Sequence, residues 1–596
     1  MRIILSVLLS LSLTLQAQEK TSPNEIPVKR KGAIKGRVVG DDGQPVEGVQ
    51  VYVWGLGDSA NSQSVTTDEE GNFLAEGLTQ IPYQISAQAK GFVLPHLSGG
   101  AKNYRIGELA NLSLVKGGVI TGRVTNAQGD PVVAVRLQIT RLRDAEGRKI
   151  SEASESGYRN FKTDDRGIYR IYGLPAGKYL VGVGGKPLHS WGPPDAHDHD
   201  SPTYYPSSTK DTAVEVGVNL GEEVTNINIR YRGEKGYFIS GKLAGGGTET
   251  TGANNSISVT LLNYPSHSAL MNDSVMLMNP SRLFAFYGVA DGEYEVVANT
   301  NSFGAEPDQA QFFAPPRRVS VKGGNVENVT LQMQMLASVA GKVMVESVVE
   351  KTEKLTCKSD RQALPDETVV KIVRDTGGKE EPYDPWSYEH TTAPNDKGTI
   401  KFRNLVAGHY YLTTQLPDEN WYVKAITLSG QNSAVAPPVK TNTVVTKSLP
   451  ETDVGKQGLS LSAGEKKQEL LLTIASGAAS LSGKITAPQN TLLARMRVHL
   501  LPAEKEAADD LLRYSEVKTK ADGAFVFANL APGKYWLLLR NVDESEAEEK
   551  PAPPAAWDAK LRQQLRREAE AANNLVELKA CQRVNDYVVI AEARTQ

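Results

Sequence analysis

The sequence predicts an all-β protein made of tandem β-sandwich domains, because two short motifs recur in a fixed order. The head motif is an apolar residue, any residue, Gly, a basic residue and an apolar residue. It occupies residues 34–38, 120–124, 239–243, 339–343 and 481–485. The tail motif is an apolar residue followed five positions later by Tyr. Its copies are Leu78 and Tyr83, Leu174 and Tyr179, Val289 and Tyr294, Leu405 and Tyr410, and Leu530 and Tyr535. Five ordered pairs of head and tail indicate one domain repeated five times.

The clearest copy of the pattern is the stretch 163–181, which predicts a turn, a strand, a second turn and a second strand. Asp165 and Gly167 have the turn chemistry, since Asp can bond the backbone ahead and Gly tolerates positive φ. Residues 168–172 are β-branched or aromatic, as in strands. In the head motif, apolar residues two apart on each side of the Gly lie on one face of a strand. The Gly itself indicates a bulge or a close backbone approach.

Alternation of apolar and polar residues predicts the sandwich. Residues 45–53, 131–139 and 497–500 follow the heads and alternate in this way, as expected for sheets with one buried and one wet face. Several short strands per unit then favour two packed sheets. The head glycines stand at 36, 122, 241, 341 and 483, which gives separations of 86, 119, 100 and 142 residues. Unequal separations argue against a propeller or a solenoid and favour a string of domains, or a bent rod, with modest interfaces.

The motifs divide the mature chain into five expected units, with larger insertions in the second, fourth and fifth. The units are 33–115, 116–232 with a loop insertion at 187–209, 233–335, 336–476 with an insertion at 346–395, and 477–596. We expect the five tail tyrosines to occupy equivalent places at the start of a late strand.

The insertion in the fifth unit predicts one C-terminal helix over about 555–572. Trp557, Leu561, Leu565 and Ala569 recur every four residues among charges, which is typical of an amphipathic helix. We expect it to pack against the last sandwich. The alternative is a helix that binds a partner or a membrane surface.

The N-terminus predicts secretion. Arg2 precedes an apolar run at 3–15, and Ala17 offers a cleavage site before Gln18, so residues 1–17 are expected to be a signal peptide and 18–32 a linker. The alternative is a retained anchor, for which the run is short. No later stretch is apolar enough to span a bilayer. A net charge of −3 gives no concentrated basic face for nucleic acid.

Cys357 and Cys581 are the chain's two cysteines. They could form one bridge in an oxidising compartment, between the fourth unit and the fifth, or none.

The motifs resemble the carboxypeptidase regulatory-like domain, a transthyretin-like β-sandwich grouped with carbohydrate-binding-like folds. In the first unit the resemblance rests on residues 36–38, 45–46, 48–49, 67–73 and 90–92. The third unit lacks the Thr-Asp-x-x-Gly turn, and the fourth keeps only residues 395–398 of it. Similar units recur in secreted bacterial multidomain proteins and at the N-terminus of outer-membrane receptors. The resemblance implies a fold and says almost nothing of activity.

Few residues suggest chemistry. The stretch 195–200 together with His189 has imidazole and carboxylate groups that suit divalent metals, but a solvated polar loop is the favoured interpretation, and we expect no metal and no cofactor. The repeated Asp-x-x-Gly turns are explained as hairpins and not as calcium sites. The sequence has no recognisable nucleophile, zinc or phosphate-loop motif, so we expect no catalytic residue.

We therefore expect a secreted, non-enzymatic binding or scaffolding protein built of carboxypeptidase regulatory-like repeats. It would lie in the periplasm, at the outer-membrane surface or outside the cell, with an envelope protein or a polysaccharide as partner. One alternative is an array of carbohydrate-binding modules at the envelope, and another is an unrecognised hydrolase. Trp191, Tyr204 and Tyr205 are the predicted ligand-binding residues, because they put three aromatics in one polar insertion. The competing interpretation is that these rings cover the edge of their own sandwich.

Overall fold

A computed structural model gives the fold. It describes residues 31–56, 62–95, 102–149, 161–185, 196–246, 256–267, 269–276, 281–300, 309–346, 364–377, 384–386, 390–395, 397–429, 452–486, 496–520, 522–541 and 554–590. The expected signal peptide at 1–17 lies outside these ranges, as does most of the expected linker. Within them the chain forms tandem β-sandwiches, so the predicted fold class is confirmed. The exact unit boundaries remain predictions.

Unit 1 shows the basic plan of two facing sheets. Its head sheet, which carries the head motif, has the order β4 (Asn72–Leu78), β1 (Gly32–Val39), β8 (Leu109–Ser113). Its tail sheet, which carries the tail tyrosine, has the order β3 (Gln63–Thr66), β2 (Gln50–Gly55), β5 (Tyr83–Gln88), β7 (Asn103–Tyr104). The apolar residues of both inner faces form one buried core.

Unit 2 repeats this plan. Its head sheet is β12 (Ile168–Leu174), β10 (Gly118–Thr125) and β16 (Glu223–Val224), with β17 (Ile229–Arg230) also paired to β10. Its tail sheet is β11 (Leu137–Arg143), β13 (Gly177–Val183) and β14 (Thr203–Tyr204), with β15 (Val216–Val218) also paired to β13. The short strands β6 (Phe92–Val93) and β9 (Val115–Lys116) pair where unit 1 meets unit 2, and η3 (Lys210–Thr212) is a single 3₁₀ turn.

In unit 3 the two sheets join into one. The order is β20 (Ala269–Met276), β19 (Ser256–Asn263), β22 (Gly292–Thr300), β23 (Phe312–Val321), β24 (Val326–Met335), β18 (Tyr237–Gly245), β21 (Leu283–Val289). The join is a pairing of Phe312 and Phe313 in β23 with Met335 and Gln334 in β24. A single bent sheet therefore encloses the largest of the five cores.

Unit 4 widens the head sheet to five strands. The order is β28 (Thr399–Leu405), β25 (Ala337–Glu346), β33 (Lys466–Ser476), β30 (Trp421–Leu428), β31 (Thr452–Asp453). The tail sheet is β27 (Thr391–Thr392), β26 (Val369–Arg374), β29 (Gly408–Gln415), β32 (Leu459–Leu461). Two short helical segments, η4 (Pro365–Glu367) and α1 (Val454–Gln457), complete the unit.

Unit 5 returns to the plan of unit 1 and adds the predicted helix. Its sheets are β37 (Ala524–Leu530), β34 (Ala479–Thr486), β40 (Arg583–Ile590), and β36 (Ser515–Lys518), β35 (Met496–Pro502), β38 (Gly533–Asn541), β39 (Leu575–Leu578). The helical segments are η7 (Lys505–Ala507), η8 (Leu511–Arg513), η10 (Ala555–Trp557) and α2 (Ala559–Ala572). Leu565 and Ala569 of α2 are buried against Leu501 and Leu538 of the tail sheet, so the predicted packing of the helix on its own sandwich is confirmed.

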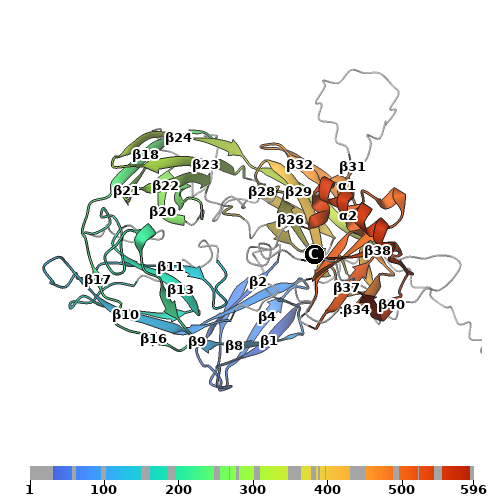
Figure 1. Cartoon of the computed structure of the whole chain (residues 1–596), viewed down its shortest axis with the longest axis horizontal. Helices are drawn as coiled ribbons and strands as arrows, with labels where there is room; N and C mark the ends of the chain where they lie inside the picture. Colours follow the sequence, from blue (N-terminus) through green and yellow to red (C-terminus); the bar gives the residue numbers. More distant parts are fainter. Residues whose placement is uncertain are drawn as a thin grey trace, which may run out of the picture.

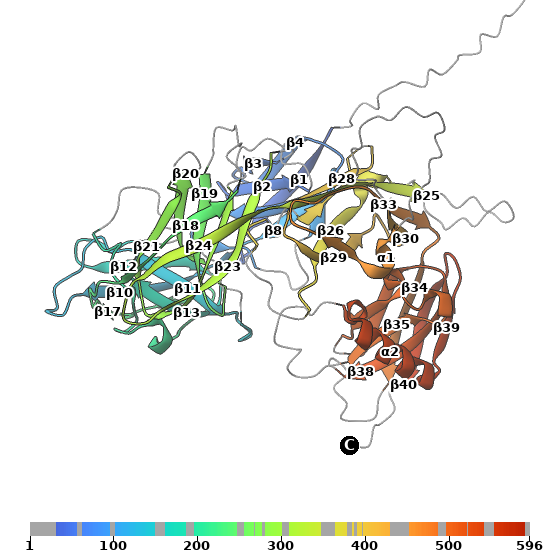
Figure 2. The ribbon, with the colours of Figure 1, turned by 90° about the horizontal axis from the view of Figure 1, so that it is seen from above.

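The units do not form a simple string. Units 1 to 4 follow a turn that brings unit 4 back against unit 1, and unit 5 extends from unit 4 (Figure 1, Figure 2). Leu56 of unit 1 is buried together with Val369 and Ala393 of unit 4. The predicted string or bent rod is therefore wrong in this respect, because two units that are not neighbours in sequence share an apolar contact.

Candidate functional site

The five tail tyrosines play one structural role. All lie within the first three residues of a tail-sheet strand, and their exposed fractions are 0 to 6%. Each hydroxyl donates a hydrogen bond to the carbonyl oxygen four residues earlier. The acceptors are Thr79 at 3.0 Å, Pro175 at 2.5 Å, Ala290 at 2.9 Å, Val406 at 2.5 Å and Ala531 at 2.6 Å. The prediction of equivalent places is confirmed, and these residues are core.

The residue directly before each tail apolar residue has left-handed backbone geometry, which the motif analysis missed. These residues are Gly77, Gly173, Gly288, Asn404 and Asn529, with φ of 73°, 68°, 73°, 56° and 57°. Only Gly and Asn occur there, and these residue types tolerate such geometry best. In unit 5 the position also joins domains, since the Asn529 amide donates to the carbonyls of Asp418 at 2.8 Å and Trp421 at 2.7 Å in unit 4.

The His- and Asp-rich stretch of unit 2 joins unit 2 to unit 3. The Asp200 carboxylate, 3% exposed, accepts hydrogen bonds of 2.5 Å from the Tyr231 hydroxyl and the Lys235 ammonium. Burial acts to raise the pKa of Asp200, but these hydrogen bonds outweigh it and hold that pKa below its usual value. The His199 ring lies 5.0 Å from that of Tyr287 in unit 3. The stretch is thus packed between units. His189 lies outside the described ranges, and within those ranges no group of three or more His, Cys, Asp and Glu residues is placed to hold a metal ion.

The three predicted ligand-binding aromatics are not brought together as one open platform in the described ranges. Tyr204 is 5% exposed, and its strand β14 pairs with β13. Tyr205 is half-buried against the core of unit 2. Trp191 lies outside the described residues. Tyr204 therefore covers its own sandwich, while ligand binding by the trio remains a prediction.

Unit 3 meets unit 4 through Trp386, a residue of the unit 4 insertion that is 1% exposed. Its ring meets Phe313 edge to face, with centroids 5.9 Å apart. Leu262 and Val297 of unit 3 and Leu336 at the start of unit 4 belong to the same buried cluster. The insertion at 346–395 therefore contributes an apolar contact between domains.

Units 4 and 5 meet along a broad contact. The rings of Tyr411 and Trp557 stack with centroids 4.5 Å apart, and the Tyr411 hydroxyl donates to the Trp557 carbonyl at 3.2 Å. Leu512 of η8 packs on the core of unit 4. The 3₁₀ turn that leads into α2 thus touches the neighbouring domain as well as its own.

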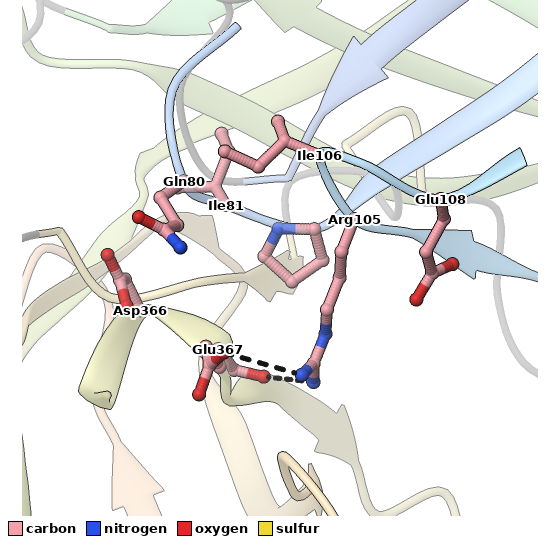
Figure 3. A pocket seen from close by; sticks show the side chains of 8 residues that line it. Gln80, Ile81, Arg105, Ile106, Glu108, Asp366 and Glu367 are labelled. Atoms are coloured by element: carbon pink, nitrogen blue, oxygen red, sulfur yellow. Dashed lines mark hydrogen bonds and ion pairs between the residues drawn. The ribbon is translucent and has the colours of Figure 1, made fainter. Parts of the chain in front are cut away.

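A partly open cavity of about 270 Å³ lies between units 1 and 4, which are not neighbours in the sequence (Figure 3). The Arg105 guanidinium lies 3.6 Å from a Glu367 carboxylate oxygen and donates to the Glu367 carbonyl at 3.0 Å. The other carboxylate oxygen of Glu367 accepts from the Leu364 amide at 3.0 Å. The cavity is lined by Gln80, Ile81, Pro82, Arg105, Ile106, Glu108, Asp366 and Glu367.

The ionisable side chains that line this cavity are Arg105 and the three carboxylates of Glu108, Asp366 and Glu367, and the lining includes no Ser, Thr, Cys, Lys or His. Both Arg105 and Glu367 are engaged with each other or with backbone. The arrangement holds two domains together.

Residues 33–99 match the family model of the carboxypeptidase regulatory-like domain. The resemblance predicted from the motifs is therefore confirmed for unit 1. The chain matches none of the curated proteins. No enzyme family is indicated by these matches.

Three solved structures are similar to parts of the chain. The TIE protein of Bacillus anthracis is 16% identical over 51% of this chain and 50% of its own, with a TM-score of 0.13. The minor pilin GBS52 of Streptococcus agalactiae is 14% identical over 34% of this chain and 96% of its own, with a TM-score of 0.19. The major pilin subunit BcpA of Bacillus cereus is 10% identical over 51% of this chain and 99% of its own, with a TM-score of 0.13. The chain thus spans about half the length of the TIE protein. At these identities and scores the similarity carries no functional information.

Two further predictions concern the compartment. Cys581 follows β39 with φ of 62°, and no cysteine of the described ranges is a free thiol. Cys357 lies outside those ranges, so its bridge to Cys581 remains a prediction. None of the helices in the described part of the chain is long and apolar enough to cross a membrane.

Proposed function

We propose that the chain is a secreted, non-enzymatic scaffolding protein that holds its carboxypeptidase regulatory-like domain and four similar sandwiches in a fixed arrangement. The observation that carries the proposal is the contact between units 1 and 4. Leu56, Val369 and Ala393 are 9%, 6% and 8% exposed there. A chain of independently moving domains would leave such residues open to water.

Polar contacts surround this apolar contact and fix the orientation of unit 1 relative to unit 4. Arg105 bonds Glu367 on one side, and the Asn103 amide donates to the Gln415 side chain at 2.6 Å on another. The Glu367 carboxylate is only 7% exposed, and a buried charge that loses its partner lowers the free energy of unfolding. The ion pair with Arg105 is therefore sensitive to the distance and orientation of the two units. The contact therefore selects one relative position of the two units.

Secretion is part of the same proposal and rests on the N-terminal sequence. Cleavage after Ala17 would give a mature protein that begins at Gln18. N-terminal sequencing of the protein recovered from the periplasm or the medium tests this. A protein that keeps residues 1–17 and stays with the membrane would contradict it. The proposed partners are an envelope protein or a polysaccharide.

The substitution Leu56→Asp tests the fixed arrangement. A carboxylate in the apolar contact should separate units 1 and 4, and the radius of gyration from small-angle X-ray scattering should rise. The control is Leu109→Asp, since Leu109 is 66% exposed on the head sheet of unit 1. It should leave the scattering unchanged. If Leu56→Asp folds with the wild-type scattering curve, the contact does not set the shape and the proposal fails.

A further inference from the structure

Trp54 stands apart from the other described tryptophans. Trp386 and Trp421 are 1% and 5% exposed, Trp536 packs beneath α2, and Trp557 stacks on Tyr411. Trp54 is 44% exposed on β2, in the tail sheet of unit 1. Exposed single apolar residues are common, so exposure alone assigns no role.

The Trp54 ring stacks on the ring of Tyr52. The rings of Tyr52 and Trp54 are stacked, with centroids 5.6 Å apart and planes within 6°. The two residues are separated by one position on a strand, so both side chains project from the outer face of the sheet. The stack uses one face of each ring. Because it restricts both side chains before a ligand binds, less conformational entropy is lost on binding.

The sheet positions that flank Tyr52 and Trp54 on β3 and β5 are polar and uncharged. By strand register, Tyr52 lies between Ser64 on β3 and Ser86 on β5, and Trp54 lies opposite Gln84. The next outward position, Gln50, lies between Thr66 and Gln88. Hydroxyl and amide groups can both donate and accept hydrogen bonds, and no residue of this set carries a charge.

We propose that this outer face of the tail sheet, centred on Tyr52 and Trp54, binds a neutral polysaccharide. The C–H faces of sugar rings pack on aromatic rings, and the sugar hydroxyls match amides and hydroxyls. An acidic glycan, a phosphate or a cationic peptide would require charges that the face lacks. The proposal rests on the scaffolding function and names its ligand class.

The location favours binding within the closed arrangement. Leu56, two residues beyond Trp54 and directly after the end of β2, is buried against unit 4. The tail sheet with β2 lies on the side of unit 1 turned toward unit 4, and β1, β4 and β8 form the other side (Figure 1). A polysaccharide on β2 would thus lie next to the contact that fixes the scaffold.

The test is titration of the whole mature chain with soluble xylan, mannan and β-glucan, with alginate as the acidic comparison. Binding is followed by affinity electrophoresis and by tryptophan fluorescence. Trp54→Ala should weaken binding of the preferred neutral glycan by about tenfold or more, and Trp54→Phe, which keeps a ring, by clearly less. The fluorescence response should vanish in both variants. The control is Leu109→Ala, a change of an exposed apolar side chain on the opposite sheet of unit 1.

Each outcome decides the proposal. Wild-type affinity in Trp54→Ala, binding of alginate alone, or no binding of any neutral glycan would overturn it. Capture of an envelope protein through Trp54 without glycan binding would also overturn it. Trp54→Ala should keep the wild-type melting temperature and scattering curve. That result would show that the scaffold itself is intact. A failure here is therefore distinguishable from failure of the scaffolding proposal, which is read from an unchanged scattering curve of Leu56→Asp and not from glycan binding.

Discussion

At the scale of single residues, the tail tyrosines show how one side chain can pack in the core and also stabilise a turn by a hydrogen bond. Tyr535 buries its ring in the core of unit 5 and donates its hydroxyl proton to the Ala531 carbonyl. It also accepts a hydrogen bond from Arg513 at 2.9 Å. A buried hydroxyl without partners would be costly, so the hydrogen bond makes burial of Tyr possible and fixes the preceding turn.

Tyr535→Phe should lower the free energy of unfolding of unit 5 by about 1–3 kcal/mol, because the Arg513 and Ala531 groups lose a partner. Tyr535→Ala should cost about 3–5 kcal/mol, because it also leaves a cavity. Burial raises the pKa of Tyr535 to about 12. A folded pKa above the unfolded value stabilises the fold at lower pH, and that stability is lost as pH rises from about 10 to about 12. The difference between wild type and Tyr535→Phe in chemical denaturation should therefore narrow over this window.

The control is Tyr287→Phe, since Tyr287 is 46% exposed. This variant should unfold like wild type at every pH. A Tyr535→Phe variant as stable as wild type at neutral pH would show that the hydrogen bond does not contribute. The sequence predicted the places of the five tyrosines from their spacing. It did not predict their acceptors, because the acceptor is a backbone group that carries no sequence signal.

At the scale of strands and helices, the head strand is the element most constrained by its partner. A Cβ on any head glycine would clash with a carbonyl oxygen of the parallel segment beside it, which is the last strand in units 3 to 5, β8 in unit 1 and the link between β16 and β17 in unit 2. These oxygens belong to Ala110, Ile227, Val329, Leu470 and Tyr587. In units 2 to 5 the residue just before that carbonyl has positive φ, as at Asn226 and Asp586. The predicted close approach is confirmed, whereas the left-handed residue of the last strand was missed because its type varies.

Gly122→Ala tests this constraint in unit 2. The added methyl would meet the Ile227 carbonyl, so β10 must shift and we expect a loss of about 1–3 kcal/mol or more. Gly217→Ala is the control in the same unit, since nothing lies within 4 Å of its added Cβ. Thermal unfolding of the two variants compares them directly. Equal melting temperatures would mean that the strand pair tolerates separation and that the glycine is not required.

The helix in unit 5 was predictable because its signal is periodic. Leu565 and Ala569 lie four residues apart on α2 and are both buried against the tail sheet of unit 5, as the spacing predicts. Asp558 caps the helix by accepting from the amides of Lys560 and Leu561 at 2.8 Å. The contact of Trp557 with unit 4 was not predictable, because the same four-residue period assigned it to its own sandwich.

At the scale of the whole molecule, the sequence predicted tandem β-sandwiches and missed their arrangement in space. Repeats are visible in the sequence because each copy needs the same types of residue at the same positions to pack its own core. The contact between units 1 and 4 depends on Leu56, Arg105, Val369 and Glu367, which are scattered over about 300 residues and follow no period. Likewise Trp54 and Tyr52 belong to ordinary strand alternation. Only the register of β2 with its neighbours shows the uncharged face around them.

The junction of units 4 and 5 gives the last prediction. The Asn529 amide spans the two units, with donors 2.8 and 2.7 Å from the Asp418 and Trp421 carbonyls. Asn529→Gly removes both hydrogen bonds but accepts the left-handed φ of 57°. We expect unit 5 to keep its own stability while its unfolding separates from that of unit 4. Differential scanning calorimetry should therefore resolve an additional transition.

Asn529→Ala should in addition destabilise unit 5 by about 1 kcal/mol, since Ala is strained at positive φ. If Asn529→Gly unfolds with the wild-type profile, the stacked pair of Tyr411 and Trp557 couples the two units without the amide, and Tyr411→Ala should then separate them.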